Sequence, residues 1–149
     1  MYRRHSIIRI LIAKACRAAA ACAVAACVFA ACTNSLQGEN SSICDAHALQ
    51  RSRVEVTASG TVTRILGIRE GPSGTHEGFL VRVPDCNIVI RVEHNVDIGG
   101  SIPLHQGEAV QLRGEYLYDP RGGIVHYTHH DPSGRHPGGS ITAGGETYN

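Results

Sequence analysis

The sequence has 149 residues, a length typical of a single domain. Its 14 basic and 13 acidic residues give a formal net charge of +1, which is far from the strong basic excess of a nucleic-acid-binding domain. The Gly-x-Ser-x-Gly, phosphate-loop and Cys-x-x-Cys motifs are all absent, which excludes three common kinds of catalytic site.

The first 31 residues have the pattern of a bacterial export signal. Residues 1–17 carry five basic residues and no acidic one, and residues 18–31 are small or apolar and uncharged. This order indicates a signal peptide, and the apolar run is too short to span a bilayer comfortably. The run ends in Phe29-Ala30-Ala31-Cys32, which resembles a lipobox. We therefore expect cleavage before Cys32 and lipidation of its thiol.

Other forms of export remain open. The stretch Val24-Ala25-Ala26-Cys27 also fits a lipobox, but cleavage there leaves five more apolar residues on the mature end. Cleavage without lipidation gives a soluble secreted protein, and the Arg3-Arg4 pair fits a twin-arginine signal poorly. The sequence thus predicts a location on the periplasmic side of an envelope membrane, or secretion. Residues 32–41 are expected to form a polar tether, and residues 42–149 the folded domain.

Removal of the signal changes the charge of the protein. Five basic residues leave with residues 1–31, so nine arginines face 13 acidic residues and the net charge becomes −4. This acidity argues against nucleic acid as a stable partner. The expected partners are the membrane, through the lipid anchor, and an unknown small ligand or envelope protein.

Two cysteines remain in the predicted domain, Cys44 and Cys86. In an oxidising compartment two cysteines favour one disulfide, which would stabilise the fold by about 3–4 kcal/mol. A pair of free thiols is the alternative.

The predicted domain begins with a short helix and continues with strands. Ser42-Ile43-Cys44-Asp45 resembles a capping box and predicts a helix to about Gln50. From Arg53 apolar and polar residues alternate with a period of two, with a bulge expected at Gly60 and a loop at 67–75. Strands are expected near residues 54–63, 79–83, 88–92, 110–118 and 124–128, followed by glycine-rich coil.

The predicted fold class is all-β: a small five-stranded OB-like barrel with a short N-terminal helix. A longer connection, residues 94–108, separates the third and fourth strands, and this spacing is typical of OB folds. An SH3-like barrel or an open meander is the alternative.

Several motifs in this region resemble a bacterial domain family of unknown function. They are His94-Asn95-Val96-Asp97, Gly114-Glu115-Tyr116, the stretch Gly122-Gly123-Ile124-Val125-His126-Tyr127-Thr128-His129-His130-Asp131-Pro132, and His136-Pro137-Gly138-Gly139-Ser140-Ile141. The resemblance covers about Val54 to Tyr148. Tyr127 and Ser140 stand where the family pattern has tryptophan. The resemblance implies no activity.

The C-terminal histidines are the strongest site candidate. On a regular strand Tyr127 and His129 face one way and their neighbours the other. The turn signature Asp131-Pro132-Ser133-Gly134 predicts a bend that returns His136 to the preceding histidines. Imidazoles bind divalent metals such as zinc, so the sequence predicts a metal site. Its candidate ligands are a subset of His126, His129, His130 and His136.

Other polar residues are candidates for catalysis or ligand binding. The predicted catalytic acids and bases are His94, Asp97 and Asp131. The predicted ligand-binding residues are His76, Asn95, Glu115 and Tyr127. The segments Pro72–Gly78 and Pro132–Gly138 both place a histidine two residues after a turn glycine, which predicts that the two turns present imidazoles at one end of the fold. The structural alternatives are that Asn95 and Asp131 only organise their own turns and that the imidazoles only bond to backbone.

Three functions follow from these candidates. The first is an exported binding module whose histidine-rich site holds a ligand or a metal. The second is a divalent-metal-dependent hydrolase, with a phosphodiester as one conceivable substrate. The third is a structural envelope lipoprotein without a site.

Overall fold

The computed structural model describes residues 40–149. The predicted signal peptide, the lipidation site at Cys32 or Cys27 and nearly all of the predicted tether lie outside the described residues. Helix α3, Ser41–Ala48, starts one residue before the predicted domain boundary. Within residues 40–149, no helix has both the length and the hydropathy to cross a membrane.

The described chain is mostly β-structure, arranged in one seven-stranded sheet with the order β1-β2-β3-β5-β4-β6-β7. A short helix, α4, follows the third strand. The strands are β1 Val54–Gly71, β2 Gly74–Val83, β3 Ile88–Asn95, β4 Ala109–Leu117, β5 Ile124–His126, β6 Ser140–Ala143 and β7 Glu146–Tyr148, and α4 is Val96–Gly99.

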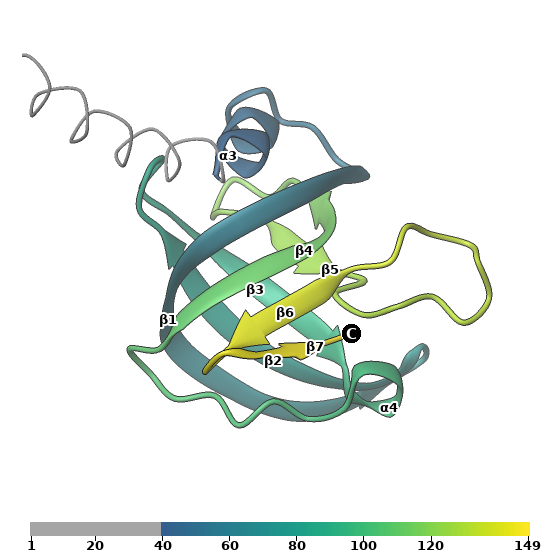
Figure 1. The fold of residues 1–149 in the computed structure, drawn as a ribbon. Coiled ribbons are helices and arrows are strands. Elements are labelled where there is room, and N and C mark those ends of the chain that lie inside the picture. Colours follow the sequence, from purple (N-terminus) through teal and green to yellow (C-terminus); the bar gives the residue numbers. More distant parts are fainter. Residues whose placement is uncertain (1–39) are drawn as a thin grey trace, which may run out of the picture. The chain divides into compact units, whose positions relative to one another are not determined.

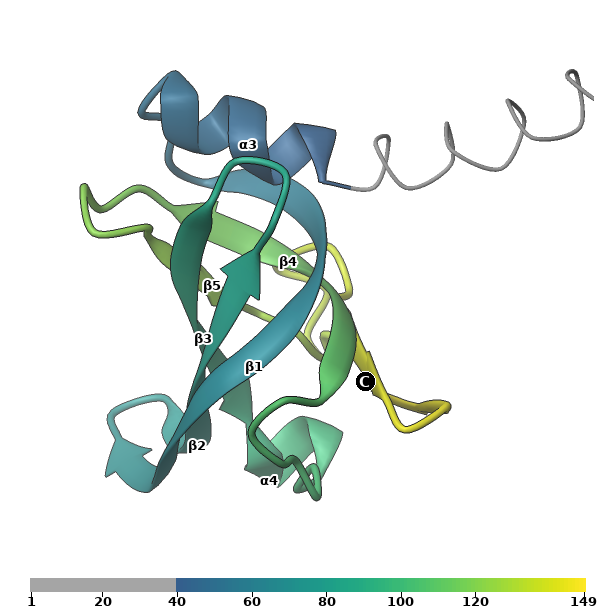
Figure 2. The same ribbon diagram turned by 90° about the vertical axis from the view of Figure 1, so that its left-hand side faces the viewer.

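The pairings of the first five strands return to their starting point. β1 pairs with β2 and, through its first half, with β4; β2 pairs with β3; and β5 lies between β3 and β4. All of these pairs are antiparallel except β3–β5. Figures 1 and 2 show the long, curved β1 passing across the other strands. β6 pairs with residues 110–113 of β4, next to β5, which pairs with residues 115–117, and β7 pairs with β6.

The C-terminal hairpin corrects the prediction of glycine-rich coil. Ile141 is fully buried, and Gly144 and Gly145 both have positive φ, as a tight two-residue hairpin turn requires. The sheet therefore has two strands more than the five expected.

The first strand also differs from its prediction. β1 continues to Gly71 and turns directly into β2, so the expected loop at 67–75 is reduced to a tight turn. The register shifts lie between Val62 and Arg64 and between Ile65 and Gly67, not at Gly60. Gly60 instead allows close approach of β2, because a Cβ there would lie 2.3 Å from the carbonyl oxygen of Arg82.

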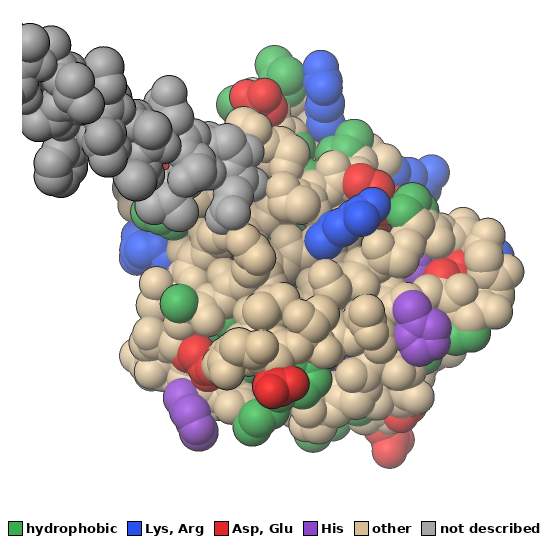
Figure 3. Space-filling model, in the orientation of Figure 1, with side chains coloured by type: hydrophobic (Ala, Val, Ile, Leu, Met, Phe, Trp, Pro, Cys, Tyr) green, Lys and Arg blue, Asp and Glu red, His purple; other side chains and the backbone are tan. Residues whose placement is uncertain are grey.

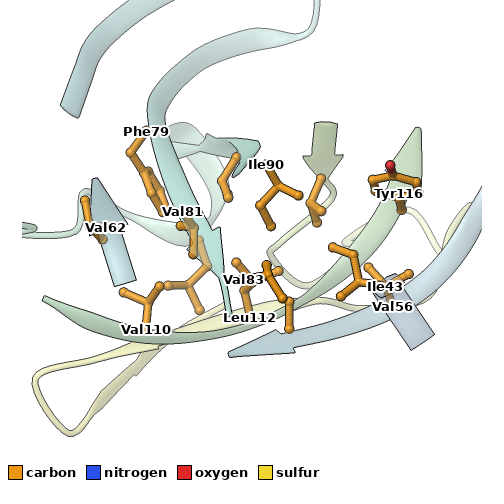
Figure 4. Close-up of a cluster of buried hydrophobic side chains, with 14 of the residues drawn as sticks. Ile43, Val56, Val62, Phe79, Val81, Val83, Ile90, Val110, Leu112 and Tyr116 are labelled. Atoms are coloured by element: carbon orange, nitrogen blue, oxygen red, sulfur yellow. The ribbon is translucent and has the colours of Figure 1, made fainter. Parts of the chain in front are cut away.

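The core consists of the inward-facing residues of the alternating strands, as expected. Phe79, Val81 and Val83 of β2 are fully buried and pack with side chains from β1, β3 and β4 (Figure 4). Ile43 and Ala46 of α3 complete one side of this core. Burial of an apolar side chain of this size contributes about 1.5–3 kcal/mol.

The predicted helix and disulfide are both present, but the predicted capping box is wrong. Cys44 of α3 is bonded to Cys86 in the β2–β3 turn. Asn40, not Ser42, is the N-cap residue, and its side chain makes no capping hydrogen bond. The Ser42 hydroxyl instead accepts a hydrogen bond from the backbone N–H of Thr57, 3.0 Å away on β1.

Candidate functional site

One side of the sheet carries a polar cleft of about 790 Å³. Its walls come from the end of the β1–β2 hairpin with Ser73 and His76, from α4 with Ile98, from the outer face of β4 and β5, and from the segment His129–Gly139. This last segment, which we call the histidine loop, projects from the sheet in Figure 1 and is closed by a hydrogen bond from the Gly139 N–H to the His129 carbonyl oxygen (2.9 Å). Figure 3 shows histidine surface (purple) beside this loop and a separate histidine patch at the lower left of the view.

Tyr127 ends β5 and redirects the chain. Its φ is +53°, a conformation that is uncommon for an aromatic residue and breaks the alternation of a strand. β5 therefore stops at His126, two residues before the predicted end. Beyond it Thr128 and His129 are both buried, so the predicted strand parity is wrong from Tyr127 onward.

Tyr127 is the middle ring of a three-ring stack. Its ring centroid lies 4.0 Å from that of His126 and 4.0 Å from that of His136, with interplanar angles of 28° and 15°. Two rings cannot both occupy the same face at that distance, so the imidazoles cover opposite faces. His129 stands edge-on to His136, with ring centroids 5.5 Å apart. The faces of Tyr127 are thus closed to a stacked ligand, whereas its edge and hydroxyl remain accessible.

Asp131 holds the histidine loop in shape. Oδ1 accepts hydrogen bonds from the N–H and the hydroxyl of Ser133, and Oδ2 accepts from the N–H groups of Arg135 and His136. These bonds, above all the one from the Ser133 side chain, hold the pKa of the Asp131 carboxyl well below its usual range. Such a carboxylate is a weak base, so the geometry favours loop organisation over the predicted catalytic role.

The wall opposite the histidine loop includes the β1–β2 turn, which is held in place by Asn95 and Asp97. Asn95 accepts a hydrogen bond from the Asp97 N–H (3.0 Å) and donates to the Ser73 carbonyl oxygen (2.9 Å). The Asp97 carboxylate accepts from the Thr75 N–H at 2.7 Å. Asn95 is the N-cap of α4, which agrees with the structural alternative that Asn95 organises its own turn. Together Asn95 and Asp97 also fasten the β1–β2 turn at the rim of the cleft.

His94 lies behind the cleft and has no free ring nitrogen. It is fully buried; Nδ1 is 2.9 Å from the Thr128 hydroxyl oxygen, and Nε2 is 3.1 Å from the Gly100 carbonyl oxygen. Burial lowers its pKa. Gly99 is required beside it, because a Cβ there would lie 2.4 Å from the imidazole. His94 was a predicted catalytic residue, and the structure gives its ring the contacts of a packed histidine.

Three other histidines keep one ring nitrogen available. Nδ1 lies 3.0 Å from the Gly74 carbonyl oxygen in His76, 2.6 Å from the His130 carbonyl oxygen in His129 and 2.8 Å from the Pro137 carbonyl oxygen in His136. A carbonyl oxygen only accepts, so Nδ1 carries a hydrogen and Nε2 is the nitrogen left without a hydrogen bond. In His136 that Nε2 lies 3.8 Å from Oδ2 of Asp131, beyond hydrogen-bond distance. All three residues line the cleft.

The pKa of His129 is lowered, chiefly by burial and also by the charges of neighbouring histidines. Its ring is therefore neutral near pH 7, with Nε2 ready to accept a hydrogen bond or bind a metal. In this conformation, however, no three His, Cys, Asp or Glu side chains within residues 40–149 lie close enough together to hold a metal ion.

Glu115 and His126 form a pair across β4 and β5. They are register partners, and Nε2 of His126 lies 3.0 Å from Oε1 of Glu115. This bond orients the imidazole and leaves its Nδ1 free. Glu55, opposite Glu115 on β1, has a pKa raised mainly by burial.

The structure thus brings most of the predicted site residues together. His130 is the exception among the predicted metal ligands: it is exposed and is not part of the cleft lining, and only its backbone oxygen contacts His129. Asp97 is also not part of the cleft lining, but its hydrogen bond with the Thr75 N–H connects it to the β1–β2 hairpin at the rim of the cleft.

Six residues that line the cleft were not among the predicted site residues. They are Arg53, Ser73, Ile98, Pro132, Ser133 and Arg135. The repeated Pro-Ser-Gly segment could have identified Ser73 and Ser133, because both copies lie beside predicted site histidines. No local pattern marks Arg53, whose place depends on the pairing of β1 with β4.

A family model described as "Protein of unknown function (DUF3465)" matches residues 25–149. The chain belongs to this family. The match confirms the predicted resemblance to a domain family of unknown function, and it leaves the individual motifs untested. A comparison with curated proteins found no match.

Proposed function

We propose that this protein is an exported envelope protein, anchored by a lipid at Cys32, whose cleft binds a small polar ligand. The observation that carries the proposal is that three imidazoles along one cleft, those of His76, His129 and His136, each have Nδ1 bonded to a backbone carbonyl and Nε2 without a hydrogen bond. Orientation of a ring by its second nitrogen is typical of functional histidines. The circuit of pairings from β1 through β2, β3, β5 and β4 supports a small barrel of the OB type beneath this cleft.

The cleft favours a small ligand over a polymer. OB folds bind oligonucleotides and oligosaccharides with the β1–β2 and β4–β5 loops, and this cleft uses only the first of them. Arg53 and Arg135 both line the cleft, and neither has an ion-pair partner among the salt bridges of residues 40–149. A ligand with an acidic group would therefore find cationic partners here, beside imidazole acceptors.

A filled-cleft variant tests this proposal. Ser73 lies exposed at the rim, and Ser73→Trp would place an indole in the cleft. The matched control is Asp85→Trp, an exposed residue of the β2–β3 turn that is not part of the cleft lining. The chain has no natural tryptophan, so each variant also gains a single fluorophore.

Tag-free protein would be incubated with a low-molecular-mass extract of bacterial envelopes in the presence of EDTA, and retained compounds would be identified by mass spectrometry. We expect compounds retained by the wild type and by Asp85→Trp, and lost in Ser73→Trp. Equal retention by all three proteins, or none by any, would contradict a ligand site in the cleft.

The proposed anchor has its own test. Radiolabelled palmitate should be incorporated into the wild type and not into Cys32→Ser. Persistent labelling in Cys32→Ser that disappears in Cys27→Ser would assign the lipid to the other candidate.

The pair of Glu115 and His126 supports hydrolysis as a second candidate function. A carboxylate that orients an imidazole and leaves the other nitrogen free has the arrangement of a general base. In this function His126 Nδ1 would take a proton from a water that attacks the substrate. A Glu115→Gln variant should then lower the rate of phosphodiester hydrolysis by roughly 10²–10⁴-fold. A wild type without hydrolytic activity, with or without added zinc, would remove this candidate.

A further inference from the structure

We propose that His129 and His136, joined by His76, bind a divalent transition-metal ion through their Nε2 atoms. This inference deepens the proposed function, because it assigns a ligand class to part of the same cleft.

The first argument is the orientation of the rings. Metal-bound histidines almost always donate their other ring N–H to a carbonyl, a carboxylate or water, which fixes the tautomer. His76, His129 and His136 all donate Nδ1–H to a backbone carbonyl oxygen, at distances of 2.6–3.0 Å. His94, by contrast, has both nitrogens occupied and cannot take part.

The second argument is the spacing of the nearest pair. Two imidazoles bound to one tetrahedral ion at ~2.0–2.1 Å have ring centroids about 5 Å apart. The centroids of His129 and His136 are 5.5 Å apart, with nearly perpendicular planes. This pair therefore has close to the required separation before any ion binds.

The third argument is that the histidine loop, which carries His129 and His136, is already ordered before an ion binds. Asp131 accepts a hydrogen bond from the His136 N–H at 2.8 Å, Tyr127 stacks on the His136 ring, and the Gly139–His129 hydrogen bond closes the loop. Because the loop is ordered by its own contacts, little conformational entropy is lost when an ion binds.

The third imidazole has to move. No three ligating side chains among residues 40–149 converge in this conformation, so His76 must turn toward the pair to complete the set, which breaks its hydrogen bond with the Gly74 carbonyl oxygen. The ring orientation seen here therefore supports His129 and His136 more strongly than His76, which lies half-buried on the facing wall of the same cleft. The ion would then bridge the β1–β2 turn and the histidine loop.

This ligand set differs from the one expected from the sequence. His126 uses Nε2 for Glu115, and the side chain of His130 is exposed outside the cleft lining. Neutral imidazoles suit zinc, copper and nickel, whereas magnesium and calcium prefer oxygen ligands. We therefore expect copper to bind more tightly than zinc or nickel, manganese to bind weakly, and magnesium not to compete.

The test is a zinc titration of tag-free full-length protein at pH 7.5 by calorimetry. We expect one ion per chain, with at least a tenfold loss of affinity in His129→Ala and in His136→Ala and a smaller loss in His76→Ala. His130→Ala, which removes an exposed imidazole from the same loop, and His105→Ala, which removes an exposed one far along the chain, are the matched controls and should bind zinc like the wild type.

A second measurement uses only the wild-type protein and so does not depend on whether the variants fold. In ¹⁵N-labelled wild-type protein, zinc should shift the Nε2 resonances of His129, His136 and His76 and leave those of His94 unchanged. Absence of a stoichiometric ion, equal losses in the two control variants, or zinc-induced shifts confined to other histidines would each overturn the assignment. Retention of small molecules in EDTA is independent of zinc, so the metal site can fail while the proposed function stands.

Discussion

Helix α3 and the cleft differ in what their histidines bond to: a side chain of a distant strand in α3, and nearby backbone in the cleft. In α3, Nδ1 of His47 lies 2.9 Å from the Tyr116 hydroxyl oxygen. That hydroxyl gives its hydrogen to the Gly122 carbonyl oxygen, so His47 is the donor, and its hydrogen bond fastens the helix to β4. The disulfide between Cys44 and Cys86 and the burial of Ile43 serve the same purpose.

In the cleft, a backbone carbonyl oxygen accepts a hydrogen bond from Nδ1 of each of three histidines, and Nε2 of each has no hydrogen bond. Exposure alone does not reveal this difference: His129 is 4% exposed and His94 is 0% exposed, yet only His94 has both nitrogens bonded. The comparison teaches that hydrogen-bond partners, and not exposure, show which imidazoles keep a ring nitrogen available. It also predicts that stability and binding can be altered separately.

The largest effect on stability is expected at the disulfide. Cys86→Ser opens a loop with a sequence separation of 42 residues and should lower the free energy of unfolding by about 3–4 kcal/mol. Urea denaturation of the oxidised protein measures this change, and dithiothreitol should destabilise the wild type without affecting the variant further. Ligand and zinc binding should persist in the folded variant. A parallel loss of binding under native conditions would mean that the two regions are coupled.

His94→Gln should cost about 2 kcal/mol, because it leaves buried polar partners without their hydrogen bonds. The pKa of His94 is lowered in the folded protein, so the unfolded chain takes up the proton first as pH falls. The stability that the neutral His94 ring contributes is therefore present above about pH 6.5 and is lost as pH falls through the folded pKa. Urea titrations at pH 7.5 and 5.5 should show a smaller pH effect in the variant. An unchanged pH effect would rule out His94 as its source.

Tyr116→Phe should cost about 1 kcal/mol through the lost hydroxyl contacts. Burial raises the pKa of Tyr116 from 10.0 to about 12. The unfolded chain therefore loses its proton first, and stability should decline as pH rises from 10 towards 12. The variant should lack that part of the decline, while Tyr148→Phe, a partly buried tyrosine of β7, should retain it. The same alkaline decline in all three proteins would contradict this assignment.

The smallest global effects are expected at the two walls of the cleft. Asp131→Ala should remove the amide protection of Arg135 and His136 in hydrogen exchange, and Asp97→Ala that of Thr75, each without affecting the other wall. Neither variant should shift the urea midpoint measurably. Asp131→Ala should nevertheless weaken zinc binding, because it releases His136. Loss of protection throughout the core would show that the walls are not independent of the fold.

The sequence predicted most of the sheet because the strands alternate regularly. Phe79, Val81 and Val83 face the core as expected, and the turns after Val83 and Leu117 lie where Pro84-Asp85 and Asp119-Pro120 indicated. The C-terminal hairpin was missed because β6 and β7 are short. Its Gly144-Gly145 pair was nevertheless a recognisable turn signal.

The site was predicted in its composition and less well in its geometry. The matching turns at Pro72 and Pro132 did bring His76 and His136 to one cleft. Two features could not be read from local sequence. The positive φ of Tyr127 depends on the packing of its ring between two histidines, and the hydrogen bonds of His94 depend on Thr128 and Gly100, which are distant or irregular in the chain.

The short strand β5 has a consequence for how the chain folds. Only two register pairs, Arg91 with Ile124 and Val92 with Val125, join it to β3. Gly122 allows this contact, because a Cβ there would lie 1.9 Å from the Val89 carbonyl oxygen. β5 pairs with β4 across the short turn of residues 118–123, whereas its pairing with β3 joins Arg91 to Ile124 and has to close a longer loop. We therefore expect the β3–β5 pairing to form late in folding and to separate early in unfolding, which would expose the edges of β3 and β5 to other chains.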